Sequence, residues 1–406
     1  MSTATYSIAT AEGGFLADGF QLSGQDLKRS LDGVKKAIVP LFKRPGEEDG
    51  IAGSGGVIAS ARDLVTWVSM LLALGRHPHR NEQIIPAEVI KHTATGASTI
   101  PTNVFNGFPE MSVSVYGTGQ QIFSYPGHEI VEHDGNVLGF SSEIIRLPDD
   151  NLGIVLLNND WVSNIALDVI KWRLIDELIV RAALPGSPFI DWVSRYKAIE
   201  ETVKEERKMF TPRPKHPALP TLAFPELQKR LYSHPTYGTL KLCFVLYSPS
   251  LPETWTERPF VEISADCPRL ISSLPVQRIL DISDPAIPTL IIPFKSAFTT
   301  HIRLTHFSGD VFNATAIWTN ADTRLKEGLG SVDENGQWTD DGDVVIPIQD
   351  FVAEWFAQGE EEGLAFKGNF WGMGVGARAP LGSGKETAEA WFSRTRGSGS
   401  DQVALY

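Results

Sequence analysis

The sequence has few cysteines, no long apolar run and no leader-like beginning. Cys243 and Cys267 are its two cysteines in 406 residues. This number excludes a disulfide framework, so we expect two buried thiols, with one disulfide as the alternative. No stretch approaches the roughly 18 consecutive apolar residues that read as a membrane-spanning helix. Residues 1–15 lack a basic segment followed by an apolar one, so the sequence predicts no secretory signal and a cytoplasmic location.

Positive charge is also scarce. The chain has 36 Lys and Arg against 49 Asp and Glu, a formal net charge of −13. Such an acidic chain does not attract the phosphates of nucleic acid. His77, His79 and His92 are conceivable metal ligands, but their polar surroundings favour a solvated turn. The acidic stretches 340–343 and 360–362 fit no calcium loop, so we expect no metal and no other cofactor.

Length and composition predict two domains. Residues 211–222 form a linker, because four prolines within 211–220 favour an extended, semi-rigid segment. It separates a first domain, 1–210, from a second, 223–406. Short alternating runs with Gly, Asp and Pro turns predict a β-barrel or β-sandwich in the second. We expect its tryptophans to pack in the core, with an apolar pocket in the barrel mouth as the alternative. These are Trp318, Trp338, Trp355, Trp371 and Trp391.

The first domain mixes helical and extended patterns. We expect helices at 60–75, 86–95, 161–183 and 190–209. Ser60 is the expected N-cap of the first, with Asp63 completing a capping box. Residues 113–159 alternate apolar and polar side chains in short runs broken by Gly, Pro and Asp. This pattern predicts an antiparallel meander with one buried face. The glycine-rich stretch 53–56 lacks the Lys-Ser/Thr of a phosphate loop, which favours tight backbone packing.

Several stretches resemble the serine β-lactamases and penicillin-binding-protein-like hydrolases. Residues 52–64, AGSGGVIASARDL, are similar to an Ala-Gly-Gly…Ser-Thr-Ala-x-Asp segment of that family. The sequence at 133–135, His-Asp-Gly, resembles its third box, a Lys-Thr-Gly or His-x-Gly that starts a strand. Residues 139–142, Gly-Phe-Ser-Ser, and 147–155, LPDDNLGIV, are similar to the turn and closing hairpin that follow. Order and spacing agree over about residues 50–185, roughly one domain.

The resemblance implies an α+β fold. It would consist of an incomplete β-lactamase/transpeptidase-like domain, an antiparallel sheet flanked by helices, and a C-terminal β domain. Residues 232–240, YSHPTYGTL, look like the opening strand of the lipocalin-like domain that often follows the catalytic one. By resemblance, then, the second domain is a lipocalin-like barrel or sandwich.

The resemblance also implies acyl transfer through a serine ester, acting on a small-molecule ester or amide. His133 would take the basic position of the third box. Gly135 would allow close approach of the substrate, and Asn136 would donate an oxyanion-hole N–H. Asp134 is expected to hydrogen-bond locally. Tyr116 is expected to pack, with a place in the lining of the cleft as the alternative.

The nucleophile of the family is missing. Neither Ser-x-x-Lys nor Tyr-x-Asn precedes His133. The single Ser-x-x-Lys, from Ser194 to Lys197, follows the third box and is expected to be a coincidence. We therefore expect an inactive homologue or an N-terminally truncated chain. The alternative is a non-catalytic module that binds a small ligand or a partner through the remnant cleft or the barrel.

The missing segment has a structural consequence as well. In the family it supplies the strands next to the closing hairpin. Without them, residues 152–157 would form an edge strand, and the apolar flank of the helix at 161–183 would be uncovered. An exposed apolar edge predicts self-association. The alternatives are that residues 1–50 and the C-terminal domain cover it, or that a missing segment belongs there.

Overall fold

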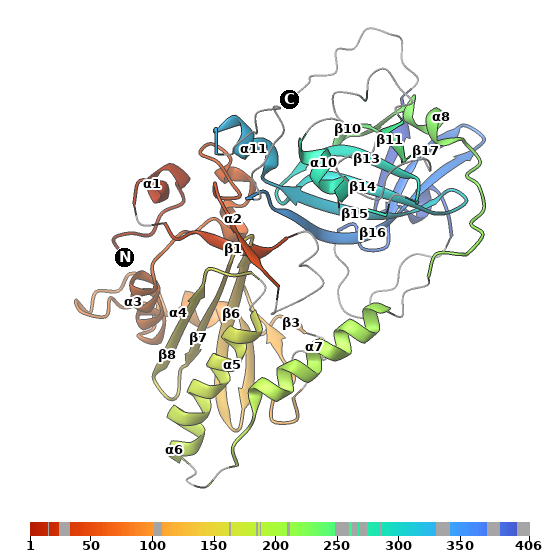
Figure 1. Ribbon diagram of the computed structural model, residues 1–406. Coiled ribbons are helices and arrows are strands. Elements are labelled where there is room, and N and C mark those ends of the chain that lie inside the picture. The colour runs from red at the N-terminus through yellow and green to blue at the C-terminus, as the bar shows by residue number, and fades with distance from the viewer. Residues whose placement is uncertain are drawn as a thin grey trace. The chain divides into compact units, whose positions relative to one another are not determined.

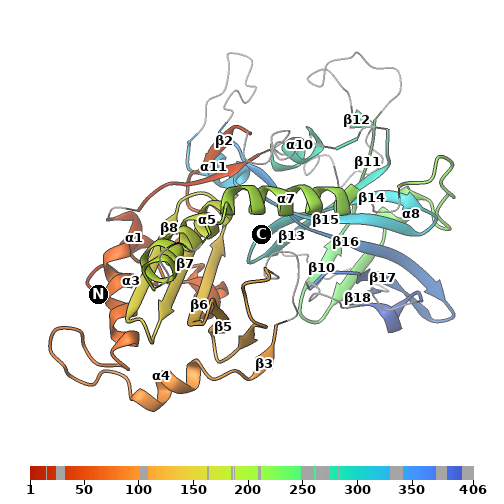
Figure 2. The same cartoon turned by 90° about the horizontal axis from the view of Figure 1, so that it is seen from below.

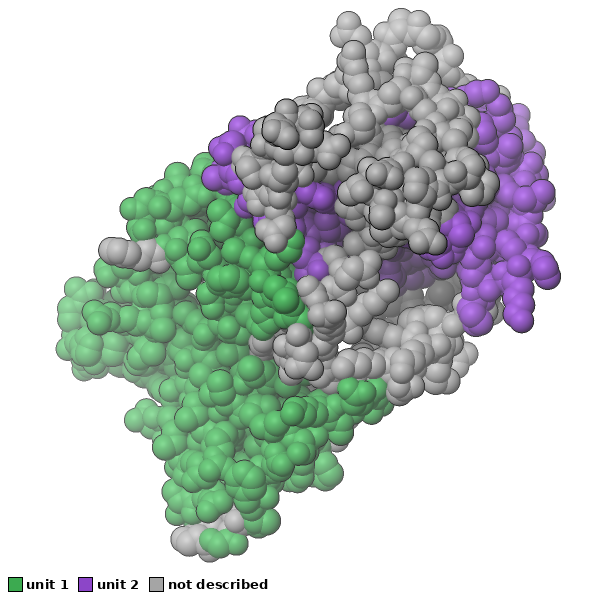
Figure 3. All heavy atoms as spheres, in the orientation of Figure 1, with its two compact units in different colours: residues 1–22, 26–210 green, residues 23–25, 211–406 purple. Residues whose placement is uncertain are grey.

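The computed structural model divides into two compact units (Figures 1 and 3). Unit 1 contains residues 1–22 and 26–210, and unit 2 contains residues 23–25 and 211–406. The structure describes residues 1–14, 16–23, 33–100, 108–161, 164–183, 186, 188–208, 212–247, 260–261, 267, 274–281, 283–284, 286–329, 342–371 and 382–395.

Unit 1 is built on a six-stranded antiparallel sheet with the order β3-β4-β5-β6-β7-β8. The strands are β3 (Ser98–Thr99), β4 (Val115–Tyr116), β5 (Gln121–Tyr125), β6 (His128–Val137), β7 (Phe140–Leu147) and β8 (Leu152–Asn158). Neighbouring strands follow one another along the chain, which confirms the predicted meander. Gly127, Gly139 and Asn151 make the turns after β5, β6 and β7, each with a positive φ that glycine adopts without strain and asparagine tolerates.

Helices cover both faces of this sheet (Figures 1 and 2). On one face lies α3 (Ala61–Leu72), whose Val68 approaches Gly153 of β8 so closely that a Cβ there would lie 2.4 Å from Val68 Cγ1. The other face carries α5 (Asn164–Ile175) and α7 (Trp192–Lys208). Between these two helices come a π-helical turn, η4 (Asp176–Val180), and α6 (Arg181–Ala183), so the predicted helix at 161–183 is not α-helical throughout.

Aromatic side chains fill the core between the sheet and α5 and α7. Tyr125, Trp172, Trp192 and Tyr196 are buried there with aliphatic residues of β6 and β7. Asp176 is buried among them and accepts hydrogen bonds from Tyr125 Oη at 2.6 Å and Trp192 Nε1 at 2.7 Å. The carboxylate therefore satisfies two polar groups that the core would otherwise leave unpaired.

The cap of α3 forms as predicted, but its capping box does not. Ser60 Oγ accepts a hydrogen bond from Asp63 N–H. The Asp63 carboxylate turns away from Ser60 and accepts from the backbone of Ser2 and Thr3, at 2.8 Å each. The Thr3 hydroxyl also donates to it, and these bonds lower the pKa of Asp63 to about 2. Asp63 thus attaches the chain start to α3, a long-range contact that a local motif does not reveal.

The remaining described elements of unit 1 lie along its N-terminal stretch. They are α1 (Ile8–Glu12), β1 (Gly19–Leu22), β2 (Lys35–Ile38), η3 (Glu48–Gly50), α2 (Ala52–Gly55) and α4 (Ala87–Thr93). The β1–β2 hairpin meets the large sheet just past the end of β8, where Phe20 N–H donates to Asn159 O at 2.9 Å. Among the described strands β8 is the last of the sheet, which confirms the predicted edge. The prediction of an uncovered helix flank is wrong, because Trp172 and Ile175 of α5 are buried in one core with residues of α7.

Unit 2 contains a ten-stranded antiparallel sheet with the order β10-β9-β18-β17-β16-β15-β14-β13-β11-β12. Its strands are β9 (Leu231–His234), β10 (Gly238–Lys241), β11 (Cys243–Tyr247), β12 (Phe260–Val261), β13 (Thr289–Ser296), β14 (Thr299–Ser308), β15 (Val311–Thr319), β16 (Val345–Gln358), β17 (Glu361–Lys367) and β18 (Ala390–Arg394). Because β10 also contacts β13, the sheet curls into a nearly closed, barrel-like form. The second domain is thus barrel-like rather than a sandwich.

Aromatic and aliphatic side chains fill the inside of the barrel-like sheet. Trp355, Phe312, Phe366 and Phe392 are buried there with leucines and isoleucines of the other strands. Trp318 is buried too, whereas Trp371 is 63% exposed. Trp338 lies outside the described residues. The expected core packing of the tryptophans therefore holds for Trp318 and Trp355 but is wrong for Trp371.

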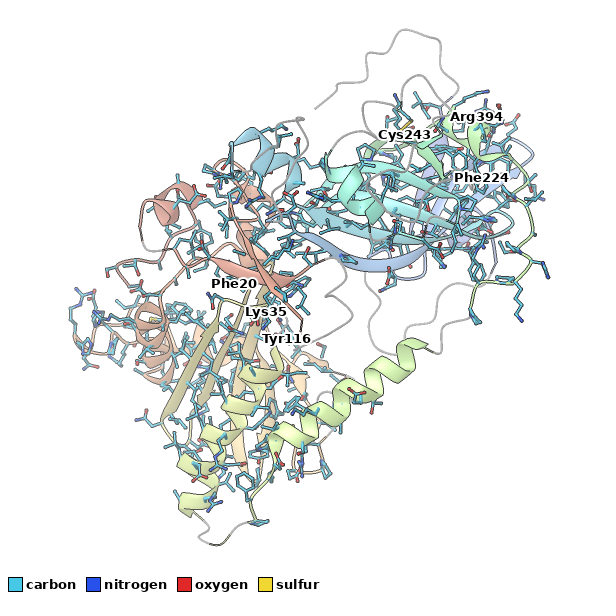
Figure 4. The ribbon with its side chains drawn as sticks, in the orientation of Figure 1. Phe20, Lys35, Tyr116, Phe224, Cys243 and Arg394 are labelled. Atoms are coloured by element: carbon cyan, nitrogen blue, oxygen red, sulfur yellow. A yellow bond between two sulfur atoms is a disulfide. The ribbon has the colours of Figure 1, made fainter. Side chains whose placement is uncertain are left out.

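A disulfide joins Cys243 on β11 to Cys267 (Figure 4). Our expectation of two buried thiols is therefore wrong, and the alternative of one disulfide is right. Both residues are buried against α10 (Leu274–Asp281), in a second core on the outside of the sheet. The bond ties Cys267 to the barrel at a place where β11 pairs with β13.

The proline-rich segment runs along unit 2. Arg213 donates to the carbonyl of His306 at 2.8 Å, and Thr221 Oγ1 donates to Asp310 at 2.7 Å. His306 lies near the end of β14, and Asp310 lies in the turn that leads to β15. The segment also precedes α8 (Phe224–Gln228), and two short elements, α11 (Ala321–Lys326) and η6 (Lys385–Thr387), complete unit 2. None of the helices in the described ranges has the length and apolar character to cross a lipid bilayer.

Candidate active site

The predicted third box lies in the middle of β6, where the pairing of this strand changes. The first half of β6 pairs with β5, as far as Glu132 opposite Gln121. From His133 to Val137, β6 pairs with β7 on one side. Among the described residues, no strand pairs with the other side of this half. An open strand edge beside a polar side chain is a place where an extended substrate can bind.

His133 is held by two hydrogen bonds. Its Nδ1 lies 2.6 Å from the carbonyl oxygen of Asp134, and its Nε2 lies 2.8 Å from Tyr116 Oη (Figure 4 labels Tyr116). A carbonyl oxygen only accepts, so Nδ1 carries the proton and Nε2 accepts from the tyrosine hydroxyl in the neutral ring. Tyr116 was expected to pack; it is instead the hydrogen-bond partner of His133.

A hollow of about 200 Å³ borders His133 on the face covered by α3. Trp67 and Leu71 of α3 line it, together with Gln120 and Arg146. Arg146 is buried and donates to the carbonyl of Leu71 and to Gln120, and burial lowers the pKa of its guanidinium. Neither a serine nor a lysine is among the described residues that line this hollow.

The three predicted site residues do not share one face of the strand. Side chains alternate along a strand, so His133 and Gly135 face α3, whereas Asn136 points to the other face. There Asn136 Nδ2 donates to Asp134 Oδ2 at 3.1 Å. At Gly135 a Cβ would lie 2.4 Å from Ser142 Oγ, so glycine is needed there for close packing of β6 on β7. The backbone of Asn136, but not its side chain, can therefore contact a substrate that lies beside His133.

The other candidate site residues from the sequence make contacts that stabilise local structure. Ser194 lies in the first turn of α7 and donates to the carboxylate of Asp191 at 2.7 Å. The same carboxylate caps α7 by accepting from the Ser194 backbone N–H at 3.1 Å, and both Ser194 and Lys197 are exposed. His77 Nδ1 accepts from two backbone N–H groups of its own turn. In the described part of the chain, no three His, Cys, Asp or Glu side chains are arranged to hold a metal.

The sheet also carries a buried charged cluster that the sequence analysis missed. Lys171 of α5 places its ammonium 3.3 Å from Glu132 of β6 and 3.3 Å from Glu143 of β7. Asp168, one turn earlier on α5, is 3.1 Å from the same ammonium. The sequence does contain a pattern that indicates this cluster. Glu132 and Glu143 have the strand parity of the buried Ile130 and Ile145, and Lys171 lies four residues from both Leu167 and Ile175 on the apolar face of α5.

Burial dominates the titration of this cluster. It raises the pKa of Glu143 to about 8, although the nearby Lys171 acts in the opposite direction. Burial also raises the pKa of Glu132. The three carboxylates together raise the pKa of Lys171 well above its usual value, against the effect of burial. The cluster therefore holds a charged lysine and at least one carboxyl group that binds its proton tightly.

Residues 12–177 match the family model described as Beta-lactamase. Among curated proteins, the chain is similar to the unguisins hydrolase ungD' of Aspergillus campestris, with 29% identity over 240 residues, 58% of this chain and 40% of the relative. It is also similar to the unguisins hydrolase ungD of Aspergillus violaceofuscus, with 25% identity over 249 residues, 56% of this chain and 41% of the relative. The chain thus spans about two fifths of the length of these relatives.

Two solved structures are similar at low scores. One is the octameric penicillin-binding protein homologue from Pyrococcus abyssi, with a TM-score of 0.35 and 15% identity, covering 90% of this chain and 55% of that one. The other is the crystal structure of SurE, with a TM-score of 0.28 and 15% identity, covering 86% of this chain and 52% of that one.

The fold class follows from the family match together with the sheet and its helices. Unit 1 has a β-lactamase/transpeptidase-like fold, joined to a barrel-like β unit. The family match supports a relationship of unit 1 with the β-lactamase and penicillin-binding-protein-like serine hydrolases.

Proposed function

We propose that unit 1 forms the third-box wall of a β-lactamase-like acyl-transfer site, which binds a small ester or amide. The observation that carries this is the position of His133. Its imidazole is held by Asp134 and Tyr116 beside an open half of β6 and a hollow of about 200 Å³. The match of residues 12–177 to the Beta-lactamase model supports the reaction class.

In this proposal His133 and Tyr116 act as a proton-handling pair. The carbonyl of Asp134 keeps the proton on Nδ1, so Nε2 receives the hydroxyl hydrogen of Tyr116. A leaving group or a carboxylate of the substrate would compete for this hydrogen. The backbone N–H of Asn136 would donate to the carbonyl oxygen as charge develops on it.

We further propose that the chain does not form an acyl-enzyme by itself. Acyl transfer of this kind needs a nucleophile next to a base. The described lining of the hollow beside His133 contains no serine and no lysine, and the hydroxyl of Ser194, in the single Ser-x-x-Lys, donates to Asp191, which caps α7. The site would therefore bind substrate without turnover, unless another segment or chain supplies the nucleophile.

The substrate class in this proposal comes from the relatives. Both curated relatives are named as hydrolases of unguisins, which supports a hydrolysable ester or amide. The hydrolase activity in these names is that of the whole relatives, and this chain spans about two fifths of their length.

A binding and turnover assay on the full chain tests the proposal. Ligand-observed NMR with a penicillin-type amide and a phenyl ester should show saturable binding. His133→Ala should weaken it several-fold, because the one imidazole in the described lining of the hollow is removed. Asp150→Asn, on the β7–β8 turn, is the control and should leave it unchanged. Hydrolysis above the buffer rate would contradict the absence of a nucleophile, and equal binding by the His133 variant would contradict the site.

The edge strand β8 supports a second proposal, that unit 1 self-associates through this edge. Leu157 of β8 is 43% exposed, and a strand edge offers unpaired backbone groups to a second copy. Sedimentation velocity should show a dimer that Leu157→Lys dissociates. A monomer at all concentrations would refute this.

A further inference from the structure

A second hollow lies on the face of the sheet opposite His133. Its volume is about 210 Å³, and β5, β6, β7, α5 and α7 contribute to its lining. Four carboxylates border it, from Glu132, Asp134, Glu143 and Asp168, together with the single ammonium of Lys171. The side chains of Glu143, Asp168 and Lys171 lie on the face of the strands away from His133. Glu132 lines both hollows, and the Asp134 carboxylate lies 4.0 Å from His133 Nδ1.

The ammonium of Lys171 has no hydrogen bond left to offer. It has three N–H donors, and three carboxylates lie 3.1 to 3.3 Å from it. The fourth carboxylate, Asp134, is 62% exposed. Four carboxyl groups thus border the hollow against one cation, and their ionisation favours a positively charged occupant.

Several buried polar groups at the hollow have hydrogen-bonding capacity that the described residues do not use. Glu132 is 9% exposed, and its Oε2 accepts no hydrogen bond there, although Lys171 is near. The hydroxyls of Ser114 and Tyr196 each accept one hydrogen bond, from Gln121 Nε2 and Trp172 Nε1. Neither hydroxyl hydrogen has an acceptor among the described residues. Buried polar groups normally have partners, so these point to a ligand with both donors and acceptors.

The aromatic lining and the volume of the hollow further limit the chemical class of the ligand. Phe123, Trp172 and Tyr196 contribute aromatic rings to the lining, and aromatic rings attract organic cations. The three carboxylates that converge here already bind the Lys171 ammonium, and no three His, Cys, Asp or Glu side chains of the described residues are placed to hold a metal ion. An organic ammonium is therefore favoured over a metal ion. A hollow of about 210 Å³ has room for a molecule of about half a dozen non-hydrogen atoms.

We propose that this hollow is a binding site for a small primary amine that also carries a hydroxyl or carbonyl oxygen. The ammonium lies among the carboxylates of Asp134, Glu143 and Glu132, and the oxygen accepts from Tyr196 and Ser114. The site is separate from the His133 site, so it stands or falls independently of the proposed acyl chemistry.

Binding of a cation in this hollow is coupled to the release of a proton. Burial raises the pKa of Glu143 to about 8, so this carboxyl is largely protonated near pH 7. A bound ammonium stabilises its charged form and releases a proton. Glu132, Asp134, Asp168, Lys171 and Tyr196 face the same space. The charges of the three other carboxylates raise the pKa of Glu143, whereas the Lys171 ammonium acts to lower it.

Titration of the full chain with ethanolamine tests the site, with ethylene glycol as the neutral counterpart of the same size. Ligand-observed NMR should show saturable binding of ethanolamine with a Kd of about 0.1–10 mM, as expected for so small a ligand. Ethylene glycol should bind at least tenfold more weakly. Calorimetry in two buffers of different ionisation enthalpy should show proton release at pH 7.

Two variants and a control locate the binding. Glu143→Gln should weaken ethanolamine at least tenfold and abolish proton release. Asp134→Asn, at an exposed position that folding does not require, should weaken it at least threefold. Glu177→Gln, on the outer surface beyond α5, should leave it unchanged. Equal binding of ethanolamine and ethylene glycol, or unchanged binding in both Glu143→Gln and Asp134→Asn, would overturn the assignment and leave a hydrated polar cavity.

Discussion

The buried carboxyl of Glu143 predicts how the stability of unit 1 depends on pH. The side chain is 7% exposed, and burial raises its pKa from 4.5 to about 8. The folded protein thus binds this proton more tightly than the unfolded chain does. The resulting stability is fully present below about pH 4.5 and is lost as the pH rises through about 8.

The size of the effect follows from the linkage relation. Each pKa unit corresponds to about 1.4 kcal/mol, so an isolated group would change the free energy of unfolding by up to about 5 kcal/mol across this range. Glu143 shares its proton and its lysine with Glu132, which spreads the titration over the pair. We therefore expect about half of this value, 2–3 kcal/mol, for Glu143 alone.

Glu143→Gln should remove this pH dependence. The neutral amide has no proton to lose, so the difference in unfolding free energy between variant and wild type should grow in favour of the variant by about 2–3 kcal/mol from pH 4.5 to 8. Urea unfolding read by pulsed hydrogen exchange on peptides of β6, β7 and α5 isolates unit 1 from unit 2. Glu177→Gln, with an exposed carboxylate, should stay within about 0.5 kcal/mol at every pH. A constant difference between Glu143→Gln and wild type would refute the reasoning.

Three further substitutions test other parts of the structure. Gly135→Ala should lower stability by about 1–3 kcal/mol, because its Cβ meets Ser142 Oγ, and a second change, Ser142→Ala, should restore most of it in thermal unfolding. Tyr116→Phe should shift the Nε2 resonance of His133 in nitrogen-15 NMR but keep the proton on Nδ1, and loss of that tautomer would contradict the bond to Asp134. Cys267→Ser should destabilise unit 2 by about 3 kcal/mol, as expected for opening a loop of this length, and an unchanged melting temperature would argue against the disulfide.

Local patterns in the sequence were sufficient for much of unit 1. The meander from β4 to β8 follows from alternation and from turn residues such as Gly127 and Gly139, which act within a few positions. The same holds for Ser60 as the cap of α3. The edge position of β8 was predicted from the family resemblance rather than from its own residues.

What the sequence did not reveal depends on contacts between distant segments. The bond between Tyr116 and His133 requires β4, β5 and β6 to lie side by side in one register. The ion pairs of Lys171 require α5 to cross two particular strands. The pairing of Cys243 with Cys267 depends on how a loop returns to β11, and two cysteines alone do not determine this.

Covalent labelling of serines tests the central claim most directly. The purified chain is incubated with a fluorophosphonate and, separately, with a penicillin-type acylating agent, and its intact mass is measured before and after. We predict no adduct with either reagent, since the hollow beside His133 has no serine in its described lining. A stoichiometric adduct that peptide mapping places on any serine, and that denaturation abolishes, would contradict the account.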